Sequence, residues 1–346
     1  QNNEKEKQSY ANKSDLIVSG VENKKLVEDI RSYNIYNITD NIIKNSKMPI
    51  LKRIERINNL EVGSDLVQEK TNTNGLVEIP KANFLTSTPY IFSEEEIEVI
   101  TEFSKSENIN LKTTFFHVGN LKTSANLSYM GGLGGSKYLL SGSDQEKEKQ
   151  KEIKNLVFEI YAYLDWITYL EQFKQLKFVR LALSNQGTIF ENDITLTLKF
   201  PSNVYMKSEE LLPPGPSIIE EILDTEFIPN IFGDINSVEI NSYRYPIGAT
   251  LPRYQLPSFP GYDNTPKYND LKEDYFKEHK KIECYNEYEE NGYIVQKYHF
   301  EELKQYTSIS FPSVLLFNYD NVCVEIEYEI ISRSNPHKKQ KVVKVN

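Results

Sequence analysis

The sequence predicts an α+β protein, in which a helical N-terminal region precedes an antiparallel β-sandwich. Residues 145–176 carry apolar side chains at spacings of three and four, the period of a long helix. Residues 178–200 alternate apolar and polar side chains on both sides of a turn-like segment, and Cys323–Ile330 alternates in the same way. Alternation of this kind is typical of antiparallel sheets with one solvent-facing side, and the strand spacing favours an immunoglobulin-like sandwich.

The segment 178–200 is the strongest strand signal in the chain. Ser184-Asn185-Gln186-Gly187 has turn chemistry, so we expect two strands that form a hairpin around it. The apolar positions of the two strands are Val179, Leu181, Leu183, Ile194, Leu196, Leu198 and Phe200. Leu181 and Leu196 should therefore be buried in the core of the sandwich.

Three regions follow from these patterns. Residues 1–14 are polar without a period, and we expect a disordered end or linker there. Residues 15–176 should be mainly helical, with a helical pattern from Glu22, an interruption at Pro49 and the long helix 145–176. Residues 177–346 should form the β-sandwich, with a Tyr/Pro-rich insertion at 243–262.

Composition limits the classes of partner. The net charge of -10, from 40 basic and 50 acidic residues, argues against a chain that coats nucleic acid, although a local basic patch stays open. Two distant cysteines, Cys284 and Cys323, make no disulfide framework, so a cytoplasmic location is expected. No apolar run approaches the roughly 18 residues of a membrane span, and no membrane partner is predicted. Because the chain begins with Gln1, we favour one part of a longer protein.

Motifs that carry chemistry are weak. The glycine-rich loop 129–137 lacks the order of a phosphate-binding loop, and a surface loop is favoured there. Glu152-Ile153-Lys154 and Glu278-His279-Lys280 have the spacing of a nuclease motif without its strand context. No histidine or cysteine pair has metal-ligand spacing. We therefore predict no catalytic residue, no metal and no cofactor in this chain, and leave enzyme activity open but disfavoured.

The second half of the chain resembles a β-sandwich at the C-terminal end of multidomain bacterial proteins. Some of those proteins carry a Schlafen-type AlbA_2 domain and others look like anti-phage defence proteins. The resemblance rests on ordered matches at 181–188, 193–194, 200–201, 211–213, 295–303, 311–315 and 325–330. It implies an accessory module of an intracellular defence protein and brings no catalytic residues.

The expected function is a non-catalytic sensor, scaffold or assembly region of such a defence protein. It would act through protein contacts with an effector domain or subunit, in a homo- or hetero-oligomer. The alternative is a nuclease or nucleic-acid-binding component of the same kind of system. Nucleic-acid binding would use Arg244, Arg253 and the lysines at 338, 339 and 341.

Two aromatic stretches are candidates for partner binding. Tyr163, Trp166 and Tyr169 fall beside the apolar stripe of the long helix, where Ile153, Ile160 and Leu164 should face the core. The Tyr/Pro-rich insertion adds Tyr243, Arg244 and Tyr254. Aromatic and arginine side chains are the usual anchors of protein interfaces. An equal alternative is that both stretches cover the chain's own core.

Overall fold

The computed structural model describes residues 13–63, 87–126, 137–246, 265–318, 323–336 and 339–345. It contains both helices and antiparallel sheets, so the predicted α+β class is confirmed. The chain forms two compact units. We call them the β-rich unit, with described residues 13–39, 166–246 and 265–345, and the helical unit, with described residues 40–63, 87–126 and 137–165. This division does not follow the predicted boundary at residue 176, because the N-terminal strands belong to the β-rich unit.

The β-rich unit contains three antiparallel sheets. The largest has the order β14-β13-β8-β10-β9, with bounds Lys339–Val345, Val324–Ile331, Glu191–Pro201, Tyr293–Leu303 and Tyr285–Glu290. The second has the order β11-β7-β1-β2, with bounds Ser308–Ser310, Leu181–Asn185, Leu16–Glu22 and Lys25–Val27. A two-stranded sheet pairs β12 (Leu315–Asn318) with β6 (Leu176–Val179).

One hydrophobic core joins the two larger sheets. In β8, Ile194, Leu196, Leu198 and Phe200 are fully buried, while the residues between them are more exposed. They share a core cluster with Leu16 and Val18 of β1, and with Leu181 and Leu183 of β7. The predicted burial of Leu181 and Leu196 is confirmed.

The predicted hairpin is wrong. β7 pairs with β1 and β11, whereas β8 pairs with β10 and β13, so the two strands lie in different sheets. The turn-like residues form a corner instead, in which the Asn185 side chain donates hydrogen bonds to the carbonyls of Ile189 and Leu303. Turn chemistry predicts a change of chain direction, and it does not distinguish a hairpin from a corner between sheets.

The N-terminal segment also differs from its predicted helix. Residues 16–27 form β1 and β2, because Leu16 and Val18 face the core between the sheets, Val21 packs against Ala182 and Ile240 on the other face, and β1 pairs in register with β7. Helix α2 begins only at Tyr36 and continues to Asn59, with Pro49 inside it. Ile50, Ile54 and Ile57 are almost fully buried after Pro49, and this packing outweighs the hydrogen bond that proline removes.

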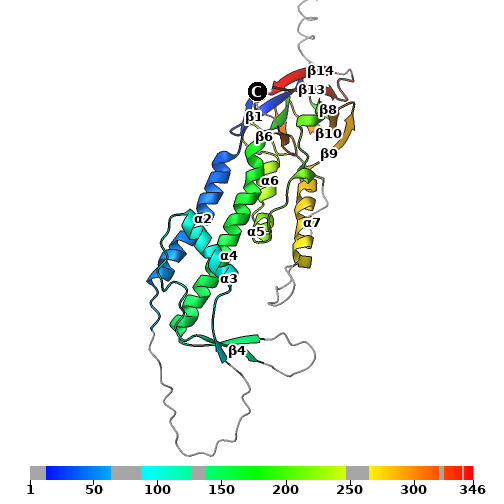
Figure 1. Cartoon of the computed structure of the whole chain (residues 1–346). Helices are drawn as coiled ribbons and strands as arrows, with labels where there is room; N and C mark the ends of the chain where they lie inside the picture. Colours follow the sequence, from blue (N-terminus) through cyan, green and yellow to red (C-terminus); the bar gives the residue numbers. More distant parts are fainter. Residues whose placement is uncertain are drawn as a thin grey trace, which may run out of the picture. The chain divides into compact units, whose positions relative to one another are not determined.

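The helical unit consists of α2 after residue 39, α3 (Glu94–Ser106), α4 (Asp144–Glu171) up to residue 165, and a small sheet. Figure 1 shows these three helices beside one another. The sheet has the order β3-β4-β5, with bounds Ser87–Pro89, Lys122–Asn126 and Lys137–Ser141. Ser93 and Glu96 form a capping box at the start of α3. The region is thus less uniformly helical than predicted.

Three further helices belong to the β-rich unit together with the C-terminal end of α4. They are α5 (Ile219–Asp224), α6 (Phe227–Phe232) and α7 (Thr265–Ile282). Short 3-10 helices, labelled η1, η2 and η3, span Gln172–Gln175, Ser202–Val204 and Ser208–Glu210. Most of the glycine-rich loop, residues 129–136, lies outside the described residues, as do residues 1–12 and 247–264.

The buried stripe of β8 makes a testable prediction about stability. Leu196→Ala should lower the free energy of unfolding by about 2–5 kcal/mol, because it removes a fully buried side chain and leaves a cavity. Chemical denaturation measures the loss. The control is Leu212→Ala, whose side chain is 63% exposed, and which should change stability by less than about 0.5 kcal/mol. Equal effects of the two substitutions would contradict the core assignment.

Candidate functional site

The aromatic residues of α4 do not lie where the sequence placed them. Tyr163, Trp166 and Tyr169 are only 7%, 5% and 2% exposed, whereas Leu164, assigned to the core stripe, is 42% exposed. The expectation that these three side chains flank the buried stripe is therefore wrong. Their role in binding a partner stays a prediction, but their rings are mostly covered by the chain itself.

The reason for their burial is a cluster of aromatic rings in the β-rich unit. Trp166 packs against Phe227 of α6 with ring centroids 5.8 Å apart. Tyr169 packs against Tyr275 of α7, and their hydroxyl oxygens are 3.1 Å apart. Helices α6 and α7 thus cover the C-terminal end of α4. In the helical unit, Tyr163 packs edge-on against Phe103 of α3 with centroids 5.6 Å apart.

The other predicted partner residues lie near the start of the Tyr/Pro-rich insertion. The Tyr243 ring is half-buried against Phe300, and its hydroxyl donates a hydrogen bond to the His299 carbonyl oxygen at 3.2 Å. Arg244 is exposed and forms an ion pair of 2.9 Å with Glu302. Tyr254 lies outside the described residues. Tyr243 and Arg244 are therefore brought together beside β10.

A small cavity lies beside the aromatic cluster in the β-rich unit. Its volume is about 20 Å³, which is room for about one water molecule. Its lining combines polar and aromatic side chains from α6, α7, η3, β9 and the segments next to them, among them Tyr205, Ser208, Phe232, His279, Glu283 and Tyr285. A cavity with such lining can hold a water-sized polar species by hydrogen bonds.

His279 is the most unusual residue of this lining. Its side chain is 1% exposed, and neither ring nitrogen has a hydrogen-bond partner in the described part of the chain. The ring packs against Phe232 and Tyr275, with centroids 4.9 and 4.8 Å away. Burial lowers the pKa of His279 from 6.5 to about 4, so the imidazole is neutral at pH 7. A neutral imidazole offers one donor and one acceptor to whatever occupies the cavity.

Glu283 follows His279 at the end of the same helix. Burial raises the pKa of Glu283 above its usual value, and a hydrogen bond from the Ser208 hydroxyl opposes this rise. Burial also raises the pKa of Tyr285, which keeps its phenol protonated. The cavity therefore combines a neutral imidazole, a half-buried carboxyl group and hydroxyl groups.

Sequence reasoning missed this site because the segment 265–282 reads as a highly charged stretch. A signal was nevertheless present, since Leu271, Tyr275, His279 and Ile282 recur at helical spacings of three and four. Tyr275, His279 and Ile282 are buried in the structure. A histidine on such an apolar stripe indicates first a buried structural residue and only second a functional site.

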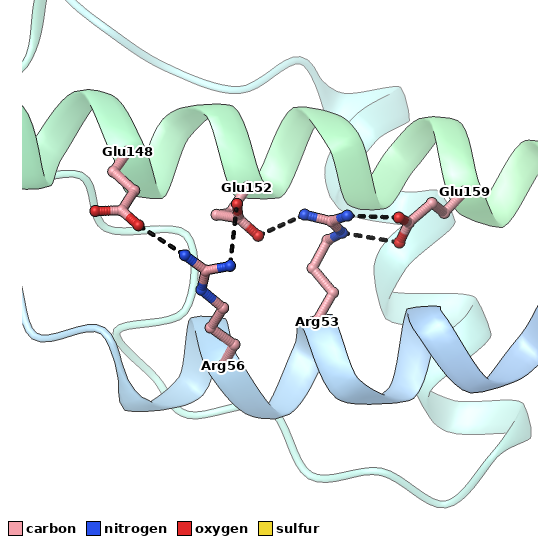
Figure 2. A network of polar contacts seen from close by, with 5 residues as sticks. All are labelled: Arg53, Arg56, Glu148, Glu152 and Glu159. Atoms are coloured by element: carbon pink, nitrogen blue, oxygen red, sulfur yellow. Dashed lines mark hydrogen bonds and ion pairs between the residues drawn. The ribbon is translucent and has the colours of Figure 1, made fainter.

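A network of ion pairs joins α2 to α4 in the helical unit (Figure 2). Arg53 donates to both carboxylate oxygens of Glu159, at 2.8 and 2.6 Å, and to Glu152. Arg56 reaches Glu148 at 2.8 Å and Glu152 at 3.7 Å. Hydrogen bonding to Glu159 raises the pKa of Arg53 further, so its charge is permanent. The network fixes the two helices against each other.

The two nuclease-like spacings lie on helices, and the carboxylates of both are already paired. Glu152 is bound by Arg53 and Arg56, and Lys154 pairs with Glu96. Glu278 pairs with Lys281 at 2.7 Å on α7. Within the described ranges, no group of three or more His, Cys, Asp or Glu side chains could hold a metal ion, and both cysteines are free thiols. In the same ranges, no helix is both long and apolar enough to span a membrane.

Comparison with known proteins gives no family. Neither a protein-family model nor a curated protein sequence matches the chain.

The buried imidazole predicts a pH dependence of stability. Because the pKa of His279 is about 4 in the folded chain and 6.5 ordinarily, the unfolded chain binds more protons between these pH values. Stability should therefore fall as the pH drops through this window, by about 3 kcal/mol in total from this group. Urea denaturation at a series of pH values measures it. His279→Phe should lose this part of the pH dependence, whereas His299→Phe, an exposed control, should retain it. Parallel pH curves for wild type and His279→Phe would refute the assignment.

The network in Figure 2 makes a second prediction, because its two arginines differ in exposure. Arg53 is 23% exposed and Arg56 is 57% exposed. Arg53→Met removes the partner of part-buried Glu159 and leaves Glu152 only the longer pair with Arg56, and should cost about 2 kcal/mol. Arg56→Met removes an exposed pair and should cost less than about 1 kcal/mol. Chemical denaturation of both variants measures the two losses of stability. A larger loss for Arg56→Met than for Arg53→Met would contradict the predicted difference between the two arginines.

Proposed function

We propose that the chain is a non-catalytic sensor, scaffold or assembly region of a bacterial anti-phage defence protein, located in the cytoplasm. Its C-terminal half would be an immunoglobulin-like β-sandwich, the accessory module that the sequence resembles. The effector activity would reside in another domain or another subunit. The chain would act by holding and positioning that effector.

The observation that carries the proposal is the role of the matched residues. Ser184 shares a hydrogen bond of 2.8 Å with Ser308, and Asn185 ties the corner to Leu303. The Phe200 and Tyr328 rings lie in the core shared by both large sheets. These matched residues of the resemblance thus serve strand pairing, the corner between the sheets and the shared core. Such a motif supports a structural module more than a reactive site.

A surface on α4 supports the assembly part of the proposal. Phe158 is 69% exposed and lies on the same face of α4 as Lys154 and Tyr161. Those two neighbours bind Glu96 and Glu95 in the acidic first turn of α3. An exposed ring beside acidic groups has the character of an interface anchor. If the long helix carries an interface, Phe158 is a better candidate for its centre than the buried Trp166.

The alternative, a nuclease or nucleic-acid-binding component, has less support. Arg244 is paired with Glu302, and Lys339 is paired with Asp15 at 2.8 Å. Binding of phosphate by these side chains would compete with existing carboxylate partners. Arg253 and Lys338 lie outside the described residues.

Co-purification tests the proposal. The chain is co-expressed with the proteins encoded next to it, and complexes are isolated through a tag on the chain. We expect an effector subunit to co-purify, and Phe158→Glu to reduce its recovery without loss of thermal stability. The control Leu212→Glu changes an equally exposed apolar residue of the β-rich unit and should leave recovery unchanged. Metal-dependent cleavage of plasmid DNA by the chain alone would overturn the non-catalytic proposal.

A further inference from the structure

The five-stranded sheet ends in two edge strands of opposite charge. β9 contains Glu287, Glu289 and Glu290 and no basic residue. β14 contains Lys339, Lys341 and Lys344 and no acidic residue. Figure 1 shows the two strands at opposite ends of the sheet. In the described part of the chain, β9 pairs only with β10 and β14 pairs only with β13. Each strand therefore has one side whose backbone groups can accept another strand.

Several of these charges have no ion-pair partner among the residues that the structure describes. Glu287 is bound by Gln296 at 2.8 Å and by Lys207 at 3.6 Å, and Lys339 is bound by Asp15. Lys344 forms a pair of 3.4 Å with Glu325, although both side chains are more than half exposed. Glu289, Glu290 and Lys341 have no ion pair among the described residues, and all three are exposed. Charge is thus left over on both edges, negative on β9 and positive on β14.

The charges restrict which edges can pair. Charged residues on an edge strand protect it against random pairing whatever their sign. Two copies that pair β9 with β9, or β14 with β14, would place like charges opposite each other, which is unfavourable. Pairing of β9 with β14 places opposite charges together. The opposite signs therefore exclude the two symmetric contacts and favour the asymmetric one.

The directions of the strands allow this asymmetric contact. Every neighbouring pair from β14 to β9 is antiparallel, so the first and fifth strands of the sheet run in the same direction. A second copy placed by translation along the sheet brings its β14 beside β9, parallel and with the same face toward the core. The faces also match in residue type. Tyr285 and Val343 both pack against the core, so alternation puts Glu289 and Lys341 on one face and Glu290 and Lys344 on the other.

We propose that a second copy of this chain docks its basic strand β14 on the acidic strand β9, so that the five-stranded sheets of successive copies join. The inference rests on the proposed assembly role and specifies its contact. The contact is heterologous, because different surfaces of the two copies meet, and it leaves one free edge at each end. Repetition gives an open chain of copies, or a ring if the rotation between copies closes. The strands have similar lengths, Tyr285–Glu290 and Lys339–Val345, so one edge can cover the other.

The test measures self-association of the full chain by sedimentation velocity at several concentrations and ionic strengths. We expect the wild type to form assemblies that grow with concentration and dissociate at high salt, because exposed ion pairs are screened. Two charge reversals are compared: Glu289→Lys with Glu290→Lys on β9, and Lys341→Glu with Lys344→Glu on β14. Each should weaken association at least about tenfold, since each puts like charges on the meeting edges.

Mixing the two variants separates a pairing defect from a folding defect. The variant with a basic β9 can accept the acidic β14 of the other variant, and the second contact between them is the native one. Neither variant should assemble alone, and an equimolar mixture should assemble again. The control reverses Glu98 and Glu102 to Lys, which changes the net charge as much on the exposed side of α3 and should leave assembly unchanged.

Three outcomes would overturn the edge pairing. They are a wild type that is monomeric under all conditions, reversed variants that associate like the wild type, and a mixture that does not assemble. If an effector still co-purifies with a monomeric chain, the edge contact fails while the proposed function stands. If copies assemble through their edges but no effector is recovered, the proposed function fails and the edge contact stands.

Discussion

The side chain of Asn185 is the interaction on which the β-rich unit depends. Between β7 and β8 the chain leaves one sheet and enters the other, and Asn185 and Gly187 are buried in this corner. The Asn185 carboxamide donates to the carbonyls of Ile189 and Leu303 and accepts from the amide of Gly187, at 2.8, 3.2 and 3.0 Å. A Cβ atom on Gly187 would come within 2.2 Å of the Lys13 carbonyl, so the corner also requires glycine. With the corner fixed, the apolar sides of both sheets face one core.

The same corner shows how far the sequence could predict the fold. Burial of Leu181 and Leu196 followed from alternation, because a strand with one buried face places every second side chain inside whichever sheet it joins. The pairing partner did not follow, since a hairpin and a corner use the same turn residues. Helix α4 was predictable because its apolar period extends over many turns, whereas β2 lies in the segment after Glu22 that was predicted to be helical. The structure of such short segments depends on the strand with which they pair, and the local sequence pattern does not identify that strand.

The missed helix α7 explains part of the error about the candidate site. Without α7, the ring of Tyr169 lacked a cover in the predicted fold, as Trp166 did without Phe227 of α6, and both read as a surface for a partner. In the structure, Tyr169 meets Tyr275, and the same helix carries His279 into the cavity. A neutral imidazole that is 1% exposed without a described partner costs stability, since its donor and acceptor lose water. A buried polar group without a described hydrogen-bond partner is where function or strain is expected. His279 on α7 is such a group, at the end of an otherwise apolar cluster.

In the proposed contact, the edges of the five-stranded sheet would allow an acidic protein with charged surfaces to assemble. An exposed ion pair contributes at most about 1 kcal/mol, so charge alone cannot hold two copies together. Backbone hydrogen bonds along β9 and β14 would supply the affinity, as in other cases of strand addition, and the charges would select which edges meet. Because the selecting pairs would be exposed, the proposed contact would be weak and reversible, and its strength would depend on ionic strength. In the proposed scaffold role, such a contact would extend the sheet only when copies are concentrated.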